Sequence, residues 1–568
     1  MSAHTEAAPR EQEALKPLDS LAFDSWFTKD LPADPLKLNR LREVHGAFFS
    51  WVEPTPSGGD PETLIASDEV ARLIGLDPAE TQRPEFARIF AGNEPLPGAQ
   101  PFAQCYGGHQ FGVWAGQLGD GRAISLGEVT NAEGEHWELQ LKGAGRTPYS
   151  RSADGRAVLR SSVREYVASE AMAALGVPTT RALSLVATGE EIWRDMFYDG
   201  NPRPEPGAVV CRVARSFVRF GTFQLPCARG GDHIDLVKKL ADHILARHYP
   251  ALAEAGNEGG ADENPRTGGK DNGSGEEKEQ QHSSPNRYEA LLGAIAERTA
   301  DLVAHWHRVG FVHGVLNTDN MSVLGDTIDY GPFAFMERFD PGFTPNTTDL
   351  PGRRYCFKNQ PGICQFNLLM LGKAFVLGGL LDTPALERAL ERFADRMADA
   401  YQDAARRKLG LREFDPGLYA GLMSLMVEDH ADFTNTWRAL REVAAEGEGL
   451  PQRLEEAVAG EAGGSLSEER AAEWAAFADA YRAVLRDQGV TSEEQRRLMD
   501  AANPAIIPRN HVLVDIIKRV EAGDKQVLAQ YMAALRQPYA ESADIDPAWT
   551  RPGPKQVRRG VELLSCSS

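Results

Sequence analysis

A short stretch of the chain combines the residue types that hold a divalent cation beside a phosphate group. It reads His313-Gly-Val-Leu-Asn-Thr-Asp319-Asn320, and the triplet Asp329-Tyr-Gly331 follows it. Amide and carboxylate oxygens are the ligands that hard cations prefer, and Mg²⁺ commonly shares its coordination with a substrate phosphate. We therefore expect Asn320 and Asp329 to hold Mg²⁺ or Mn²⁺ at a nucleotide site.

The order of these residues follows the pattern of protein kinases, with one important exception. Kinases place an Asn shortly after a His-Arg-Asp triplet and then an Asp-Phe-Gly triplet. Asn320 and Asp329-Tyr-Gly331 match the last two elements, but Val315 occupies the position of the catalytic Asp. Valine cannot accept a hydroxyl proton, and a carboxylate reappears only at Asp319. The chain is therefore either a nucleotide-binding scaffold or an enzyme whose base, and whose reaction, have moved.

A glycine-rich segment precedes a predicted strand in the N-terminal half. It reads Gly116-Gln-Leu-Gly119-Asp-Gly121-Arg122. Clustered glycines let backbone N–H groups approach a phosphate, and the arginine adds positive charge. On its own, Gly-Asp-Gly is also typical of a hairpin turn without any ligand.

Lys142 and Glu165 have the arrangement that kinases use to orient a phosphate-binding ammonium. Lys142 ends a predicted strand, and Glu165 lies in the helix predicted from Arg156 to Leu175. In kinases a strand Lys is held by a Glu on a packed helix. An ordinary surface Lys and an ordinary helix Glu are the alternative for the two residues taken separately.

Several longer runs carry a more specific pattern. They are Tyr106-Gly-Gly-His-Gln-Phe-Gly112, Leu139-Gln-Leu-Lys-Gly-Ala-Gly145, Thr147-Pro-Tyr-Ser-Arg151, Asp154-Gly-Arg-Ala-Val-Leu-Arg160, Cys211-Arg-Val-Ala-Arg-Ser-Phe-Val-Arg-Phe-Gly221 and His313 through Phe333. With these runs the chain resembles the selenoprotein O family, pseudokinases that act as protein adenylyltransferases. The resemblance is dense over residues 38–375 and loose over the C-terminal third.

The resemblance implies transfer of AMP from ATP to Ser, Thr or Tyr hydroxyls of proteins, with release of pyrophosphate. It implies a nucleotide bound in the reverse sense to a kinase, with the triphosphate pointing inward. Asp319 would be the general base, and Asn320 and Asp329 would hold Mg²⁺ or Mn²⁺. The matching positions for ATP are Gly119, Gly121, Arg122, Lys142, Asp154, Gly155, Arg212, Arg219 and Asp329. A kinase with a displaced base and a non-catalytic ATP-binding scaffold are the alternatives.

The end of the chain carries a redox candidate, Cys566, in the sequence Ser565-Cys-Ser-Ser568. Members of the resembling family carry selenocysteine or Cys at this antepenultimate position, and relatives often have a partner Cys just before an Asn-x-Ser/Thr-Asp run. Here Pro345 precedes that run, which removes the expected partner. Cys356 and Cys364 are substitutes, although buried structural thiols are favoured for both.

The elements that would position these residues predict an α+β, protein-kinase-like two-lobed fold with a helical C-terminal extension. We expect a flexible tail over 1–37, a strand-rich lobe over 38–253, a disordered insertion over 254–286, a helical lobe over 287–460 and the extension over 461–568. The insertion lacks the apolar residues that offset the entropy of ordering. Later helices are expected over 288–309, 383–408, 467–488 and 511–534.

Composition excludes other classes of function. Asp and Glu number 82 against 61 Lys and Arg, for a net charge of −21, whereas nucleic-acid binding needs a basic surface. The first residues lack the apolar core of a signal peptide, and the six cysteines form no CxxC pair, which is typical of a reducing compartment. We expect a cytoplasmic monomer without nucleic-acid or membrane partners, or an organellar protein if a transit peptide precedes this chain.

Overall fold

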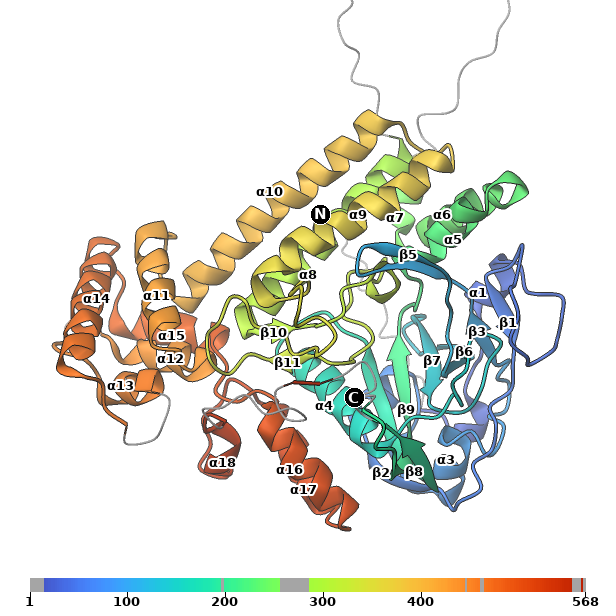
Figure 1. Ribbon diagram of the computed structural model, residues 1–568, viewed down its shortest axis with the longest axis horizontal. Coiled ribbons are helices and arrows are strands. Elements are labelled where there is room, and N and C mark those ends of the chain that lie inside the picture. The colour runs from blue at the N-terminus through green and yellow to red at the C-terminus, as the bar shows by residue number, and fades with distance from the viewer. Residues whose placement is uncertain are drawn as a thin grey trace, which may run out of the picture.

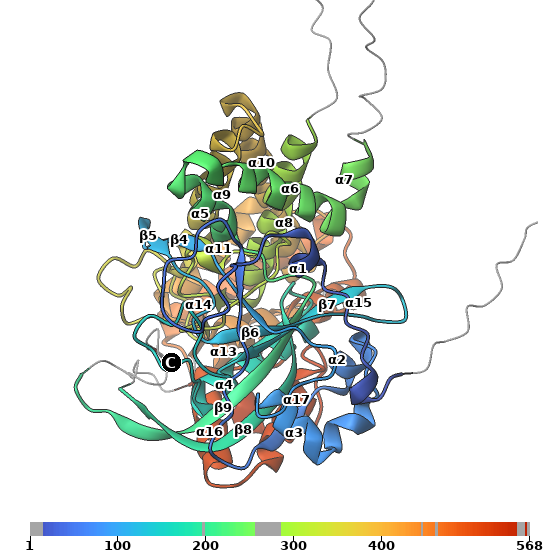
Figure 2. The same cartoon turned by 90° about the vertical axis from the view of Figure 1, so that its right-hand side faces the viewer.

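The computed structural model describes residues 15–195, 199–255, 286–444, 447–459, 464–553 and 563–564 (Figure 1). The N-terminal part is built around an antiparallel sheet, and the C-terminal part is helical (Figures 1 and 2). The predicted α+β fold, with a strand-rich lobe followed by a helical one, is therefore confirmed.

The sheet has seven strands in the order β1-β3-β6-β7-β9-β8-β2, and every neighbouring pair is antiparallel. Its strands are β1 (Phe49–Trp51), β2 (Glu62–Ala66), β3 (Phe102–Gln104), β6 (Ala123–Thr130), β7 (His136–Lys142), β8 (Arg181–Arg194) and β9 (Arg203–Ala214). A separate hairpin consists of β4 (Gly107–Gln110) and β5 (Val113–Gln117).

The central strands have one apolar and one polar face. In β7, Leu139 and Leu141 belong to the apolar core shared with α2 (Asp68–Leu73) and α3 (Pro84–Phe90). Side chains alternate along a strand, so Gln140 and Lys142 lie on the opposite face. The register pairs Gln140 with Arg212 of β9. The sheet thus presents these three polar side chains together.

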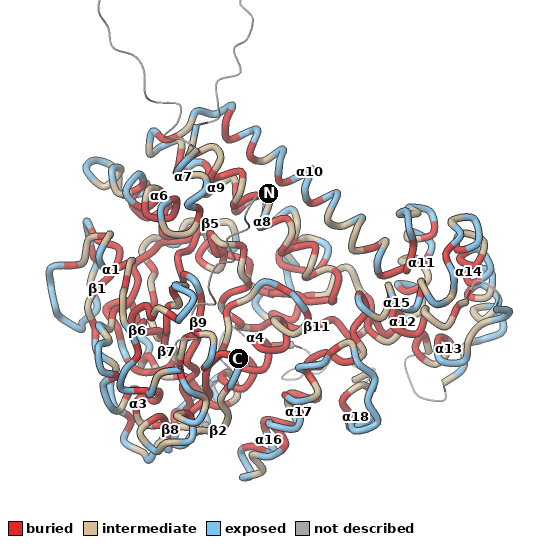
Figure 3. Tube along the Cα trace, turned by 180° about the vertical axis from the view of Figure 1, so that it is seen from behind, coloured by how far each residue is buried: buried red, intermediate tan, exposed pale blue. Residues whose placement is uncertain are grey.

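The face of the sheet that carries Gln140 and Lys142 packs against α4 (Leu159–Ala174), the helix that contains Glu165. The helix was expected over 156–175, and its observed end agrees with Gly176, which has a positive φ of 70°. From α4 the largest core continues into α8 (Arg287–Val309) and α9 (Gln360–Leu377) of the helical part. The buried residues form a continuous band through the middle of the molecule (Figure 3). The two parts therefore hold the space between them in a fixed geometry.

The N-terminal segment differs from the prediction. Residues 1–37 were expected to be a flexible tail, but Leu18 and Phe27 are 0% and 2% exposed. A short helix, α1 (Trp26–Asp30), lies at β6, where Phe27 N donates to Glu128 Oε1 at 2.8 Å. The apolar residues of this segment enter the core one at a time. They are therefore too widely spaced to give the periodicity of a helix or a strand. The prediction is wrong for residues 15–37, and residues 1–14 lie outside the described part.

The helical part begins before residue 287. Helices α5 (Phe220–Arg229), α6 (Asp235–His248) and α7 (Pro250–Ala255) lie beside α8 and α9 (Figures 1 and 2). Residues 256–285 of the predicted insertion lie outside the described residues. Two short strands, β10 (Phe311–Val312) and β11 (Ala334–Phe335), frame the stretch that contains the predicted catalytic loop.

The remaining helices form two groups, and the long helix α10 (Thr383–Lys408) leads from α9 to the first of them (Figure 1). The first group is α11 (Pro416–Glu428), α12 (Phe433–Ala439), α13 (Gln452–Ala459), α14 (Glu468–Asp487) and α15 (Ser492–Ala502). These helices share one core, so the predicted lobe boundary at 460–461 falls inside it. Within the described residues no helix is long and apolar enough to cross a membrane.

The second group contains α16 (Asn510–Glu521), α17 (Gln526–Leu535) and α18 (Pro547–Thr550). The sequence predicted a single helix over 511–534, but the chain breaks at Gly523, whose φ is 95°. Glycine adopts this backbone conformation without the penalty that a side chain would incur. The break lets α16 and α17 both pack against α4, which supports the sheet side of the cavity.

Candidate active site

A cavity of about 760 Å³ lies between the sheet and the helical part. Its walls contain every residue that the sequence assigns to ATP, metal or proton transfer: Gly119, Gly121, Arg122, Lys142, Asp154, Gly155, Arg212, Arg219, Asp319, Asn320 and Asp329. These residues come from segments far apart in the chain. Their convergence makes this cavity the candidate active site.

Lys142 and Glu165 form the ion pair that the sequence predicts. Lys142 Nζ lies 2.6 Å from Glu165 Oε2, and both side chains are largely buried. Burial lowers the pKa of Lys142, and Glu165 opposes this shift. The pair holds the ammonium at the inner wall of the cavity, where it can meet a phosphate.

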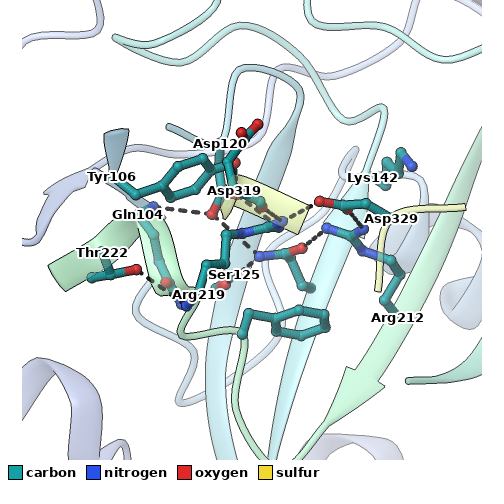
Figure 4. A network of polar contacts seen from close by, with 12 residues as sticks. Gln104, Tyr106, Asp120, Ser125, Lys142, Arg212, Arg219, Thr222, Asp319 and Asp329 are labelled. Atoms are coloured by element: carbon teal, nitrogen blue, oxygen red, sulfur yellow. Dashed lines mark hydrogen bonds and ion pairs between the residues drawn. The ribbon is translucent and has the colours of Figure 1, made fainter. Parts of the chain in front are cut away.

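Two buried arginines converge on Asp329. Arg212 and Arg219 are each 1% exposed, and both bond the Asp329 carboxylate, Arg212 Nη1 at 2.5 Å (Figure 4). Burial raises the pKa of Asp329, but Arg219, Arg212 and Lys142 together hold it well below its usual value. The two arginines are not solvated surface residues. They form, with Lys142, a cluster of three cations at the inner end of the cavity.

Asp120 is a participant that the sequence analysis missed. It lies between Gly119 and Gly121, but its side chain turns inward to Arg219 at 3.7 Å (Figure 4). Its carboxylate also accepts from Gln104 N at 3.1 Å and from Tyr106 Oη at 3.2 Å. An acidic residue inside a predicted phosphate loop is the signal that could have indicated it. Arg219 therefore has a second carboxylate partner, Asp120, in addition to Asp329.

The glycines of this loop are required by the close approach of Tyr149. A Cβ on Gly119, whose φ is 130°, would lie 2.6 Å from the Tyr149 ring, and one on Gly121 would lie 3.0 Å from the Tyr149 carbonyl. Nearer the rim, Asp154 is paired with Arg194, with Nη2–Oδ1 at 2.7 Å. The glycines therefore let the loop backbone pack closely against Tyr149.

Asp319 is a buried carboxylate with one oxygen unused. Oδ2 accepts from Gln110 Nε2 at 3.1 Å, whereas Oδ1 has no hydrogen-bond partner. Burial raises the pKa of Asp319 to about 6. The carbonyl of Asp319 accepts from Arg219 at 2.6 Å. Asp319 lines the cavity, and a carboxylate there with a raised pKa has the properties of a general base.

The donor set fits a cation that is shared with a phosphate. Asn320 Nδ2 donates to Val315 O at 2.8 Å, which fixes the amide and leaves its oxygen for a ligand. Asp329 would supply the second oxygen, and it has the uncommon positive φ of 57°. Among the described residues no group of three His, Cys, Asp or Glu forms a self-sufficient metal site. Mg²⁺ typically keeps waters and uses one or two carboxylates plus phosphates, which is what Asn320 and Asp329 offer.

The predicted redox residue Cys566 lies outside the described residues. Both suggested substitute partners, Cys356 and Cys364, are buried and free. Leu564, two residues before Cys566, pairs with the segment that begins at Pro345: its N donates to Pro345 O at 2.7 Å. Leu564 therefore lies beside the segment that the resemblance associates with a partner cysteine.

Comparisons with known proteins agree with this geometry. The family model described as Protein adenylyltransferase SelO matches residues 39–536. A Protein nucleotidyltransferase YdiU from Azoarcus sp. (strain BH72) is 46% identical over 552 residues, covering 96% of this chain and 99% of the relative. The protein of the same name from Xanthomonas euvesicatoria pv. vesicatoria is 46% identical over 553 residues, with the same coverage. The one from Rhodopirellula baltica is 42% identical over 568 residues, again with the same coverage.

One solved structure is also similar: ROP2 from Toxoplasma gondii, described as a virulence factor with a protein-kinase fold and no enzymatic activity. It is 12% identical and covers 68% of this chain and 87% of its own, with a TM-score of 0.20. A score this low does not establish a shared fold. The family match and the relatives, by contrast, extend over nearly the whole sequence. The chain belongs to the SelO family of protein adenylyltransferases.

Proposed function

We propose that the protein transfers AMP from ATP to a Ser, Thr or Tyr hydroxyl of a protein substrate and releases pyrophosphate. The observation that carries this proposal is the cluster of Lys142, Arg212 and Arg219 at the inner end of the cavity. Buried cations there suit a triphosphate that points inward. The α-phosphate then faces outward, toward the acceptor.

In the proposed reaction the carboxylate of Asp319 accepts the proton of the acceptor hydroxyl. The hydroxyl oxygen forms a bond to the α-phosphorus, and the bond from that phosphorus to the oxygen bridging to the β-phosphate breaks. Lys142, Arg212 and Arg219 stabilise the negative charge that develops on the departing pyrophosphate. Preorganised charges in a site that excludes water are effective in this role.

Asn320 and Asp329 are the residues that would hold Mg²⁺ or Mn²⁺. When bound, the cation supplies charge neutralisation of the phosphate oxygens. Asp329 is occupied by Arg212 and Arg219 in the protein alone. An incoming triphosphate offers these arginines a replacement anion, so we expect ATP and the cation to bind together.

Protein phosphorylation is the competing function, and two observations disfavour it. Val315 stands where a kinase has its base, and the carboxylate of Asp319 is the one that lines the cavity on this loop. The two reactions release different products, pyrophosphate for AMP transfer and ADP for phosphorylation. With Mg²⁺ or Mn²⁺ and a protein acceptor, we expect pyrophosphate and AMP-modified acceptor in equal amounts, measured by a coupled pyrophosphate assay and by mass spectrometry. ADP in proportion to phosphorylated acceptor would identify a kinase instead.

A further inference from the structure

The run from Tyr106 to Gly112 has no role in the proposed reaction so far, although it is among the most specific motifs of the sequence. It forms β4 and the turn of the β4–β5 hairpin, which lies beside α5 (Figure 2). Strand β4 also contacts the loop that contains Asp319. Gly108 lies directly against Asp319, because a Cβ on Gly108 would overlap Asp319 Oδ1. The hairpin is therefore one wall of the space around the base.

Contacts between the hairpin and the loop are made residue by residue. Three successive hairpin residues bond three successive loop residues: His109 N to Thr318 Oγ1 at 2.7 Å, Gln110 Nε2 to Asp319 Oδ2 at 3.1 Å and Phe111 N to Asn317 Oδ1 at 3.3 Å. Two of these bonds start from the backbone and fix the position of the hairpin. The bond from Gln110 is the one made by a side chain, and it ends on the proposed base.

The tip of the hairpin is pinned in place. Phe111 and Gly112 connect β4 to β5 with φ values of 51° and 82°, the two positive values of a type I′ turn. A positive φ is uncommon for a residue other than glycine, and here Phe111 N also donates to Tyr355 Oη at 2.8 Å. A Cβ on Gly112 would meet Arg354 at 3.2 Å. The hairpin therefore holds the Gln110 amide in a fixed position beside Asp319 Oδ2.

The Gln110 amide changes what Asp319 can do. Oδ2 receives the amide N–H, while Oδ1 remains without a partner. A carboxylate held through one oxygen cannot rotate freely, so its other oxygen keeps a fixed direction. Proton transfer depends on such geometry, and a displacement of about 1 Å can cost about a hundredfold in rate.

We propose that Gln110 is a positioning residue for AMP transfer, which holds Asp319 Oδ2 so that the carboxylate keeps the orientation in which it receives the proton of the acceptor hydroxyl. This proposal rests on the proposed function, in which Asp319 is the base. The Gln110 side chain bonds Asp319. It has no hydrogen bond to the cluster of Lys142, Arg212 and Arg219 or to the residues that would hold the metal. Its loss should therefore affect the turnover number and leave nucleotide binding unchanged.

The test compares Gln110→Met with the unmodified protein, since Met has a similar length but no N–H donor. We expect kcat for AMP transfer to fall by about tenfold to a hundredfold, with KM and Kd for ATP unchanged. Val113→Ala is the matched control, because Val113 lies on the same hairpin and is 70% exposed; it should keep the original kcat. Gln110→Ala repeats the test with a minimal side chain, and the thermal unfolding midpoint verifies that each variant is folded.

A double-mutant cycle separates positioning from a general structural effect. In a protein that already carries Asp319→Asn, we expect Gln110→Met to change the residual rate by less than about twofold. A loss of the same size in both backgrounds would show that Gln110 does not act through Asp319 and would overturn the inference. An unchanged kcat for Gln110→Met would overturn it as well. If Asp319→Asn itself kept the original rate, Asp319 would not be the general base, and the proposed function would be contradicted instead.

Discussion

Replacing Asp319 by Ala is expected to reduce AMP transfer by about a hundredfold or more, the usual scale for the loss of a general base. ATP affinity should remain close to that of the unmodified protein, because the three cations that meet the triphosphate do not depend on the Asp319 side chain. Arg219 bonds the carbonyl of residue 319 and not its carboxylate, so the substitution leaves that contact in place. Single-turnover kinetics and a fluorescent ATP analogue measure the two effects separately.

Asp326 provides a matched control for this substitution. It is a carboxylate of the same connecting segment, and burial raises its pKa to about 6, as it does for Asp319. Asp326 does not line the cavity, so Asp326→Ala should keep the original rate of transfer. Equal losses in both variants would mean that Asp319 acts on the stability of the loop and not on the proton.

Replacing Asp329 by Asn is expected to remove the dependence of ATP binding on Mg²⁺ or Mn²⁺ and to reduce transfer by about a hundredfold or more. The substitution removes the anion that Arg212 and Arg219 share, so each arginine loses one competing carboxylate, although Arg212 keeps Glu165 and Arg219 keeps Asp120. ATP affinity without metal should therefore stay the same or rise, while added metal no longer improves it. Calorimetric titration of ATP with and without metal measures this difference.

The comparison with Asp319→Ala makes the assignment of roles testable. Asp319→Ala should keep the metal dependence of ATP binding and lose turnover, whereas Asp329→Asn should lose both. If the two variants bind ATP and turn over alike, the separation between base and metal ligand is wrong. If Asp329→Asn keeps the full effect of metal on ATP affinity, the cation is held elsewhere.

The order of motifs along the chain was sufficient to predict the two-lobed fold and to place the candidate site. Lys142 with Glu165, and Asn320 with Asp329, are recognisable because each pair has a fixed order and spacing along the sequence. Only the family resemblance assigns Arg212 to ATP, because an arginine on a strand is most often solvated. Its place in the cavity wall follows from its ion pairs with Glu165 and Asp329.

Other parts of the site depend on contacts that local sequence does not encode. Gln110 and Asp319 are separated by 209 positions, and no period or spacing connects them. Asp120 is part of a glycine-rich turn in the sequence, and its inward direction is evident only from its contacts with Gln104, Tyr106 and Arg219. The N-terminal segment was misjudged for a related reason. Leu18 and Phe27 reach the core singly, and isolated apolar residues do not form a pattern.

The orientation of the nucleotide is the central claim, and ATP labelled separately at the α- and γ-phosphates tests it most directly. In the presence of Mg²⁺ or Mn²⁺ and a protein acceptor, we expect the α label to become bound to protein and the γ label to leave as pyrophosphate. This result follows from the buried cations Arg212 and Arg219 at the inner end of the cavity and from Val315 at the kinase base position. Stoichiometric transfer of the γ label to protein would contradict the reversed nucleotide and make the protein a kinase.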